Sequence, residues 1–523
     1  MHLLSEKKTK VVLVRPPDPM GMVDILSHVL PTNLGYIAAY VMREGFDVEI
    51  LDYEQEPFVG SEFLKKIEEA NPGIVGFSCM TPTIVNGHKI ATLIKKHFPE
   101  ITTVVGGAHS SGLPEQTIRE FLNFDIVAFQ EGEATFLELC ERMKEGKDFK
   151  GVAGTVRREG DSVIKEKERP FIENLDDIPF PARKLYQGSK KFRGHSSRGF
   201  TNTLNSTEIF TSRGCPYKCT FCAIVATFKR TVRFRSPETV FEEIQEVNKK
   251  FSIDHIVIAD DTFGLKKGRI ETLCEGFAKS GLKSWSCDTR VDSVTRESLK
   301  VMKASGCTKV AFGVETGSDR VIKLNEKKID LHRVRQAIVW AKEAGIKHIE
   351  ANFIVGSHPE ETLDDLKKTQ KLIKELDVTF VSISVIVPYP GTPNYEIFKK
   401  NGFIYTDDWS KYVMFGQAPG WRTKHFTAEE LLKYQKKLNT SFYLNPKYMM
   451  KLLSRVRSLN ELGYYIKSGK AFIKWALGMD ITNNVRHISN YNDGTFIPNE
   501  LYDKRRYAPQ VSTNKNVNLA SGR

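Results

Sequence analysis

Cysteine is scarce in this chain, and long apolar runs are absent. The eight cysteines among 523 residues are too few for the disulfide framework that holds small secreted domains together. No stretch has the roughly 18 apolar residues that suggest a membrane span. The first ten residues, MHLLSEKKTK, lack the apolar core of a secretory signal. These absences favour a cytoplasmic protein with reduced thiols.

Basic residues are concentrated near the C-terminal end. The formal net charge is +13, and residues 421–523 alone contain 18 Lys and Arg against 7 Asp and Glu. The first 420 residues are therefore nearly neutral, which is not the pattern of a general nucleic-acid-binding protein. We expect no nucleic-acid partner and a basic segment attached to a neutral core.

The first 150 residues alternate five short apolar runs with helical patterns, which predicts an α/β domain with a doubly wound, Rossmann-like parallel sheet. Ligands of such sheets bind at the carboxyl ends of the strands. The Gly-x-Gly-x-x-Gly pattern of dinucleotide-binding proteins is missing after the first run, residues 11–14. Small or hydroxyl residues near the third and fourth strand ends leave room for a bulky ligand: Ser78, Thr81, Thr83, Gly106, Gly107 and His109.

Strand–helix alternation resumes near residue 206, with six units in fewer than 200 residues, and predicts a partial (βα)6 barrel. A hairpin around residues 159–161 and a Pro-rich connector, 174–182, separate the two α/β regions. The expected divisions are a Rossmann-like domain 1–150, a hairpin and linker 151–205, a barrel 206–395, a mostly helical basic domain 396–506, and a disordered tail 507–523.

Three cysteines cluster in the loop after the first barrel strand. Cys215, Cys219 and Cys222 stand in the segment TSRGCPYKCTFCAI with the spacing C-x3-C-x2-C. Thiolates suit iron–sulfur clusters and zinc. Three ligands can hold three corners of a cubane cluster and leave one iron open for a non-protein ligand, which is a catalytic arrangement. The alternatives are a zinc site completed by a distant residue, or three unrelated buried cysteines.

This segment resembles the signature of the radical S-adenosylmethionine (SAM) superfamily, in which an aromatic residue, here Phe221, precedes the last cysteine. The resemblance implies a 4Fe-4S cluster on Cys215, Cys219 and Cys222, with the amino and carboxylate groups of SAM on the open iron. It also implies that one electron from the cluster cleaves SAM to a 5′-deoxyadenosyl radical.

Other strand ends resemble the SAM-binding motifs of this superfamily over roughly residues 206–395. Asp260 and Asp261 stand where many members have Gly-Gly-Glu, so the implied contact with the SAM amino group departs from the usual pattern, and helix capping is the alternative. Arg290 could meet the SAM carboxylate or pair with Asp292. The resemblance implies that Glu315 contacts the ribose; the alternative is an acid at a helix N-terminus. It implies that Gly356 contacts the adenine; the alternative is a plain turn.

The N-terminal domain resembles the cobalamin-binding domain that precedes the barrel in one large radical SAM subgroup. The matching segments are 31–36, 78–83, 105–107 and 131–133. The Asp-x-His-x-x-Gly pattern that supplies a lower histidine ligand is absent, as is usual in this subgroup, and we expect His109 to be a surface histidine. A degenerate domain that keeps only the fold is the alternative. The implied cobalamin contacts are Leu34, Gly35, Ser78, Thr81, Thr83, Gly106, Gly107, Glu131 and Gly132.

Residues 446–477 combine apolar residues at helical spacing with basic residues and interleaved aromatics. Met449, Leu452 and Leu453 form part of the apolar set, and Lys447 and Lys451 follow another face at i+4. Such a segment can lie on an anionic membrane surface or cover a hydrophobic substrate. The alternative is a helical cap on the barrel with a solvated basic face.

The resemblance implies a cobalamin-dependent radical SAM methyltransferase, and the basic C-terminal region suggests a hydrophobic or lipid-like substrate, as in the hopanoid methylases. Ring formation or oxidation is the main alternative, because the anaerobic magnesium-protoporphyrin monomethyl ester cyclase shares this domain order. An RNA methylthiotransferase needs more cysteines than Cys79 and Cys140 in the first domain, and a non-catalytic iron–sulfur protein is the last alternative. We expect a ferredoxin or flavodoxin as electron donor, and a cytoplasmic enzyme with a peripheral membrane contact.

Overall fold

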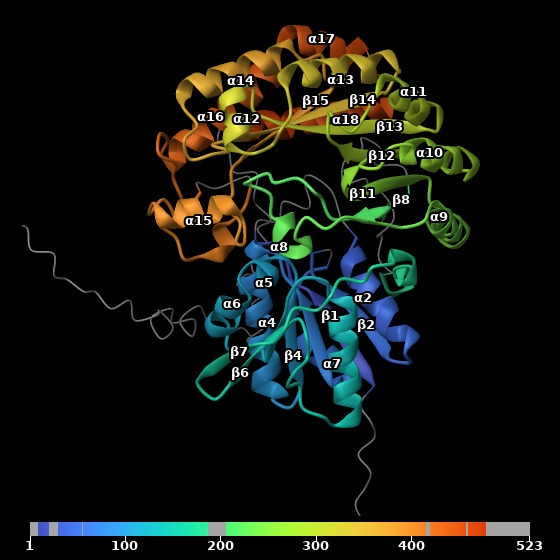
Figure 1. Ribbon diagram of the computed structural model, residues 1–523, viewed down its shortest axis with the longest axis vertical. Coiled ribbons are helices and arrows are strands. Elements are labelled where there is room, and N and C mark those ends of the chain that lie inside the picture. The colour runs from blue at the N-terminus through green and yellow to red at the C-terminus, as the bar shows by residue number, and fades with distance from the viewer. Residues whose placement is uncertain are drawn as a thin grey trace, which may run out of the picture.

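The computed structural model describes residues 9–19, 30–54, 56–186, 205–414, 419–454, 456 and 459–476. Two α/β bodies face each other, the N-terminal one in blue and the barrel in green to orange (Figure 1). Three parts of the predicted divisions lie outside the described residues: residues 187–204 of the linker, residues 477–506 of the helical domain and the tail 507–523.

The N-terminal sheet has seven strands in the order β2-β1-β3-β4-β5-β6-β7. The first five are parallel, and β6 and β7 continue the sheet as an antiparallel hairpin. The hairpin therefore belongs to this sheet and not to the linker in which the sequence analysis placed it. The strands are β1 (Lys10–Arg15), β2 (Asp47–Asp52), β3 (Ile74–Ser78), β4 (Thr102–Gly106), β5 (Ile126–Ala128), β6 (Thr155–Glu159) and β7 (Ser162–Lys165).

Helices cover both faces of this sheet, which confirms the doubly wound prediction. Successive residues of a strand point to opposite faces of the sheet. Val11 and Leu13 of β1 pack against α2 and α7 on one face, and Val12 and Val14 belong to the core on the opposite face. The helices are α2 (Thr32–Arg43), α3 (Gly60–Ala70), α4 (Ile84–His97), α5 (Ala108–Gly112), α6 (Pro114–Glu120) and α7 (Glu133–Glu145).

The second sheet has six parallel strands in the order β15-β14-β13-β12-β11-β8, as a partial (βα)6 barrel requires. The strands are β8 (Ser206–Ile209), β11 (His255–Phe263), β12 (Ser284–Thr289), β13 (Cys307–Glu315), β14 (His348–Val355) and β15 (Phe380–Val385). The helices on its outer side are α9 (Pro237–Phe251), α10 (Arg269–Lys279), α11 (Arg296–Ala304), α12 (Asp319–Leu324), α13 (Leu331–Glu343) and α14 (Leu363–Glu375).

Local sequence signals start several of these helices. Ser236 caps α9, with Pro237 at the first helical position, and its hydroxyl accepts from the Thr239 amide. Thr295 and Thr362 form reciprocal capping boxes at α11 and α14. These caps fix the residue at which each helix begins, and therefore where the loop before that helix ends.

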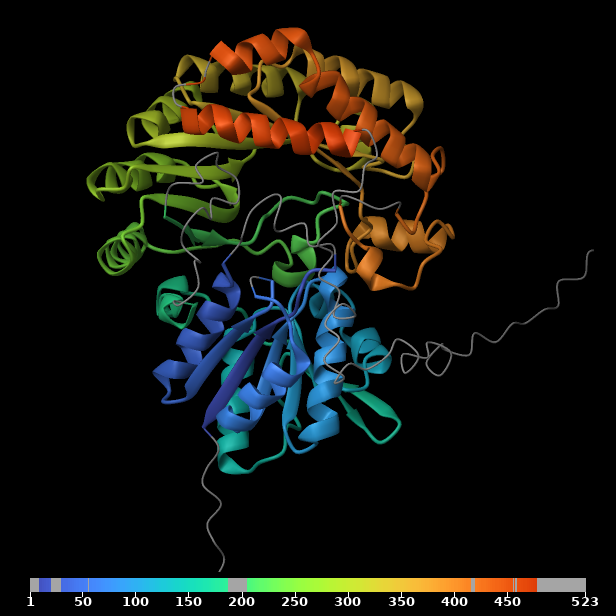
Figure 2. The same ribbon diagram turned by 180° about the vertical axis from the view of Figure 1, so that it is seen from behind.

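Short elements surround the cysteine loop, and helices follow the barrel. The short elements are β9 (Ser212–Arg213), α8 (Ile224–Phe228) and β10 (Arg233–Phe234). The later helices are α15 (Pro393–Lys400), α16 (Ala428–Tyr443), α17 (Pro446–Ser454) and α18 (Leu459–Ala476). Figure 2 shows α18 crossing in front of the barrel strands. Among the described residues, no helix is both long enough and apolar enough to cross a membrane.

Candidate functional site

The three cysteines of the C-x3-C-x2-C motif lie on one loop between β9 and α8. All three are half-buried free thiols, and Cys215 Sγ lies 3.5 Å from Thr262 Oγ1 at the end of β11. Gly214 has φ +88°, and a Cβ there would lie 1.9 Å from the Thr231 carbonyl oxygen. Only glycine fits this close approach, and the loop therefore turns tightly just before the first cysteine.

Asp260 anchors this loop. Its carboxylate accepts hydrogen bonds from the backbone amides and hydroxyls of Thr211 and Ser212, at 2.6 to 3.0 Å. Four internal donors occupy its oxygens, and the side chain is buried. The predicted contact between Asp260 and SAM is therefore replaced by a positioning role.

Asp261 differs from its neighbour because it lies open to the space between the domains. Its Oδ2 accepts from the Gly214 amide at 2.8 Å, and the residue lines the cavity described below. Burial by the surrounding protein and the charge of the nearby Asp260 raise the pKa of Asp261 to about 6. Asp261 is thus placed to accept from an ammonium group beside the cysteine loop.

Arg290 joins the third strand end to the cysteine loop. It pairs with Asp292 through two hydrogen bonds of 2.9 and 2.8 Å, which is the alternative that the sequence analysis left open. Its guanidinium also lies 3.5 Å from the centre of the Tyr217 ring, within the cysteine loop. Arg290 is therefore already engaged and supports the loop.

Glu315 has a backbone that few side chains adopt. Its φ is +70°, and its carboxylate is buried against the Lys327 ammonium at 2.5 Å. Lys327 Nζ lies 5.9 Å from the Phe221 ring centre. A strained non-glycine backbone costs on the order of 1–3 kcal/mol and clusters at functional sites. These contacts bring the predicted ribose-binding carboxylate beside the cysteine motif.

Gly356 also has a positive φ, +72°, and a Cβ there would lie 2.7 Å from Leu431. The Gly356 and Ser357 amides donate to the buried Glu361 carboxylate at 2.5 and 3.2 Å. Burial raises the pKa of Glu361 to about 8. Gly356 is therefore required by packing, and its predicted contact with adenine stays a prediction.

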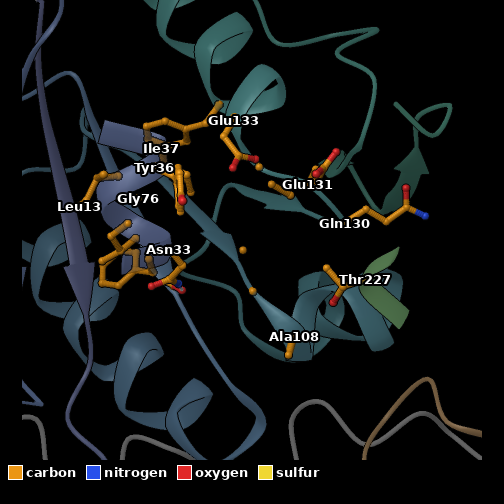
Figure 3. A pocket seen from close by; sticks show the side chains of 18 of the residues that line it. Leu13, Asn33, Tyr36, Ile37, Gly76, Ala108, Gln130, Glu131, Glu133 and Thr227 are labelled. Atoms are coloured by element: carbon orange, nitrogen blue, oxygen red, sulfur yellow. Dashed lines mark hydrogen bonds between the residues drawn. The ribbon is translucent and has the colours of Figure 1, made fainter. Parts of the chain in front are cut away.

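A cavity of about 310 Å³ lies between the carboxyl ends of the two sheets. Figure 3 shows Tyr36, Glu131, Glu133 and Thr227 around it. Six of the nine residues that sequence analysis assigned to cobalamin line its wall: Leu34, Ser78, Gly106, Gly107, Glu131 and Gly132. The barrel contributes residues from the first two strand ends and the cysteine segment: Phe210, Arg213, Thr227, Phe228 and Asp261.

The other predicted cobalamin contacts have packing roles. Gly35 lies against Tyr186, whose hydroxyl would be 2.6 Å from an added Cβ. Thr83 accepts from the Met80 amide at 3.0 Å, and Thr81 lies 3.4 Å from His109 Nδ1. His109 is only 1% exposed, so the prediction of a surface histidine was wrong, and burial lowers its pKa to about 3.

Two family models divide the chain in the same way as the fold. The B12 binding domain matches residues 22–140, and the Radical SAM superfamily matches residues 209–373. An uncharacterized methyltransferase of Pyrococcus horikoshii is 34% identical over 447 residues, which is 85% of this chain and 95% of the relative. The chain belongs to the B12-binding radical SAM family of methyltransferases.

Further relatives have different named activities. A cytidylyl-2-hydroxyethylphosphonate methyltransferase of Streptomyces wedmorensis is 27% identical, over 84% of this chain and 90% of the relative. An anaerobic magnesium-protoporphyrin IX monomethyl ester cyclase of Rubrivivax gelatinosus is 25% identical, over 89% and 82%. The solved cobalamin-dependent SAM radical enzyme OxsB shares the fold, with a TM-score of 0.68 and 20% identity, over 90% of this chain and 71% of that one.

Membership of the B12-binding radical SAM family agrees with the chemistry of the site. Three free thiols on one loop are soft donors of the kind that iron–sulfur clusters use. Among the described residues, the three cysteines included, no group of three His, Cys, Asp or Glu side chains is arranged to hold a metal ion. Glycine and alanine residues in the cavity wall leave space for a large flat ligand: Gly76, Gly106, Gly107, Ala108 and Ala128. The cofactor prediction of a 4Fe-4S cluster, SAM and cobalamin is confirmed at the level of the family.

Sequence reasoning missed two arginines of this radical SAM site. Arg213 and Arg233 contact Glu131, which the sequence analysis assigned to cobalamin. Arg213 directly precedes Gly214 and Cys215, and that position was the one available signal. The partners lie 82 and 102 residues apart in the chain, so no local pattern could join them.

Proposed function

We propose that this enzyme transfers a methyl group from SAM to an unactivated carbon atom of its substrate. When bound, the cluster and SAM supply a carbon-centred radical, and cobalamin supplies the methyl group. The observation that supports this proposal is a shared wall: Arg213, Phe228 and Asp261, next to the cysteine loop, also line the cavity of the B12-type domain. The cavity of the B12-type domain and the cysteine loop therefore share a boundary between the domains, where a bound substrate would reach both cofactors.

The chain's own residues have separate tasks in this proposal. Cys215, Cys219 and Cys222 hold the cluster, and Asp261 accepts from the SAM ammonium group. Asp260 fixes the strand end on which the loop rests. Arg290 stacks on Tyr217 and restrains the middle of the loop. Correct placement of reacting groups supplies a large part of catalysis, so we expect these positioning contacts to affect the rate.

The interior of the barrel favours a substrate with hydrogen-bonding groups. Alternate residues of the barrel strands pack into the outer core, and so their neighbours face inward. Most of the half-exposed inward residues are polar: Asp288, Glu350, Asn352, Ser382 and Ser384, beside the apolar Ala259, Gly313 and Ile354. Covering such groups with hydrocarbon costs roughly 1–3 kcal/mol each. A wholly lipid-like substrate, as expected from the C-terminal region, fits this surface less well than a polar one.

Fractionated extract tests this choice of substrate class. The cluster-loaded enzyme is incubated with methyl-labelled SAM, cobalamin, a reductant and either the aqueous or the chloroform-soluble fraction of a cell extract. We expect enzyme-dependent label in aqueous products that are neither SAM nor its known breakdown products. Label confined to chloroform-soluble products would restore the lipid-like substrate. Protein with Cys219→Ala is the matched control for background methylation.

Radical-mediated ring formation or oxidation is the second candidate, favoured by the similarity to the cyclase of Rubrivivax gelatinosus. The same incubation separates the two reactions. Methyl transfer leaves the labelled methyl group in the product, whereas cyclisation or oxidation changes the product without label. A substrate-dependent product without label, accompanied by 5′-deoxyadenosine, would contradict the methyl-transfer proposal. The proposed electron donor, a ferredoxin or flavodoxin, can replace the chemical reductant in this assay.

A further inference from the structure

Four charged side chains join the two domains beside the cysteine loop, and we call them the interdomain clamp: Glu131, Glu133, Arg213 and Arg233. Arg213 donates to Glu131 at 2.9 Å and to Glu133 at 2.6 Å. Arg233 donates twice to Glu131, each time at 2.8 Å. Two positive and two negative charges thus compensate one another across the boundary between the domains.

The clamp is almost fully withdrawn from water. Its four side chains are between 6 and 12% exposed. Arg213 lies over the Tyr36 ring at 5.1 Å, and Arg233 over the Phe171 ring at 4.8 Å. Burial would raise the pKa of Glu131, but hydrogen bonds and charges from the two arginines outweigh it and hold this pKa below its usual value. Buried charges of this kind are strongly dependent on their partners.

The clamp holds both ends of the segment that contains the cysteines. Arg213 ends β9 and Arg233 begins β10, and these two residues are directly paired in the antiparallel ladder. Residues 214–232, with all three cysteines of the motif, form the loop between them. Because both arginines bind Glu131, the base of the cysteine loop is attached to the B12-type domain at one carboxylate.

Glu131 has no oxygen left for a ligand. Each of its carboxylate oxygens accepts two hydrogen bonds, two from Arg233, one from Arg213 and one from the Ile172 amide at 3.1 Å. Glu131, Glu133 and Arg213 also line the cavity. The clamp is therefore part of the cavity wall on the side of the cysteine loop, and its two carboxylates come from the segment 131–133 that the sequence analysis assigned to cobalamin.

We propose that the interdomain clamp is a positioning device that sets the separation and orientation of the cobalamin relative to the cluster. The inference rests on the proposed function, because both cofactors must act on one substrate in one space. Two groups on separate domains keep a reactive geometry only if the contact between the domains is rigid, and an error near 1 Å can cost on the order of 100-fold in rate. Compensated, dehydrated charges at the base of the loop provide that rigidity.

A distance between two paramagnetic centres tests this role without any substrate. Protein loaded with both cofactors is reduced to cob(II)alamin and the one-electron-reduced cluster, and pulsed electron paramagnetic resonance measures their separation. We expect a single narrow distribution in the wild type. We expect a broader distribution, shifted on the order of 1 Å, in Glu131→Gln, with iron and corrinoid content per chain unchanged. Glu133→Gln, which removes one contact of Arg213, should give a smaller change in the same direction.

Glu138→Gln is the matched control. Glu138 lies on α7, as Glu133 does, and pairs with two arginines, Arg142 and Arg169, as Glu131 does, but it does not line the cavity. Wild-type distributions in both clamp variants overturn the proposal. A second result also overturns the proposal: Glu131→Gln loses corrinoid, but the molecules that keep it show the wild-type separation between cob(II)alamin and cluster. Glu131 would then be a cobalamin-binding residue.

Failure of the proposed function has a different signature. A wild-type protein that binds no corrinoid contradicts that function and, with it, the cofactor role of the clamp. If Glu131→Gln fails to fold, Glu133→Gln decides the question. Hydrogen exchange of the cofactor-free protein gives a second measurement: faster exchange of residues 211–235 in Glu133→Gln but not in Glu138→Gln supports the clamp, and equal exchange contradicts it.

Discussion

Asp260 and Asp261 are neighbours in the chain, yet they do different work because successive residues of a strand point to opposite faces. Both belong to β11, which spans His255–Phe263. Asp260 turns into the protein and binds four donors from Thr211 and Ser212. Asp261 turns toward the cavity and binds the Gly214 amide with one oxygen. A single substitution at each position should therefore have a different consequence.

Asp261→Asn should weaken SAM binding by cluster-loaded protein and flatten its dependence on pH. The carboxylate must be charged to accept well from an ammonium group, and its pKa is about 6 in the absence of SAM. Wild-type affinity should therefore rise as pH increases from 5 to 7, whereas the Asn variant should change little. A lost charge-assisted hydrogen bond of roughly 1.5–3 kcal/mol corresponds to a Kd at least about tenfold higher at pH 7.

Calorimetric titration with SAM measures this effect. Asp254→Asn is the control, because Asp254 lies just before the amino end of β11 and pairs with Lys283 instead. Equal SAM affinity of wild type and Asp261→Asn at pH 7 would remove Asp261 from the SAM site.

The role of a residue could be predicted from the sequence where that role depends on neighbours close by in the chain. The motif of Cys215, Cys219 and Cys222 is local, and sequence analysis placed it correctly in the loop after the first barrel strand. The difference between Asp260 and Asp261 was within reach, because strand alternation separates them. The partners of Glu131 were not, since they depend on how two domains meet.

The element that joins the domains carries a second buried ion network. Arg183 of the linker donates to Glu243 of α9 at 2.6 Å and to Thr207 of β8 at 3.0 Å. Arg235 binds the other oxygen of Glu243, whose side chain has no exposed surface. Burial would raise the pKa of Glu243, but the two arginines outweigh it and hold this pKa below its usual value. The network ties the linker to the first helix of the barrel.

Glu243→Gln should destabilise the protein by roughly 3–5 kcal/mol at pH 7, because it leaves two buried arginines without their counter-charge. A carboxyl with a lowered pKa stabilises the fold fully above its unfolded pKa, near 4.5, and loses this contribution as pH falls through the folded pKa. The difference between wild type and variant should therefore shrink below about pH 4.5.

Urea unfolding at a series of pH values measures this difference. Glu246→Gln, on the same helix with an exposed partner, Lys250, is the control and should change stability by less than about 1 kcal/mol. A variant as stable as the wild type at pH 7 would contradict the role given to Glu243.

The positions of helices and strands could be predicted from the periodicity of apolar residues. Which elements pack against each other could be predicted only in part. The apolar runs of both sheets and the hairpin at 159–161 gave strands close to those observed. The hairpin's place beside β5 was missed, because a sheet edge leaves no mark in the hairpin sequence. Thr81 and Thr83 were assigned to the cavity because they follow a strand. They lie in a turn that packs against Trp409 and its neighbours, about 330 residues further along the chain.

At the scale of the whole molecule, α17 and α18 present apolar residues to solvent. Tyr443 and Tyr448 fasten this region to the edge strand, through hydrogen bonds to the Val381 and Thr379 carbonyls. Exposed apolar side chains remain at Met449, Met450, Leu453, Ile466 and Ile473. Ile466, Lys470, Ile473 and Lys474 fall on one helical face at i, i+4, i+7 and i+8. We propose that this surface makes the peripheral contact with an anionic membrane.

The triple variant Lys447→Glu, Lys470→Glu, Lys474→Glu should lose binding to vesicles that contain anionic lipid. Each basic residue near such a surface contributes about 1 kcal/mol, and so reversing three should reduce binding by at least about 100-fold. Flotation with vesicles of neutral and mixed neutral–anionic lipid measures the effect. Lys65→Glu, Lys368→Glu, Lys371→Glu, on exposed faces of α3 and α14, is the charge-matched control. Equal flotation of both variants and the wild type would leave α17 and α18 as a simple cap.

The most direct test is the cleavage of SAM by anaerobically reconstituted protein. With iron, sulfide and dithionite supplied, wild type and Cys140→Ala, whose cysteine lies far away on α7, should bind a 4Fe-4S cluster and form 5′-deoxyadenosine from SAM. Cys215→Ala, Cys219→Ala and Cys222→Ala should form none. A wild type without this cluster, or full SAM cleavage after any one of these three replacements, would contradict the account.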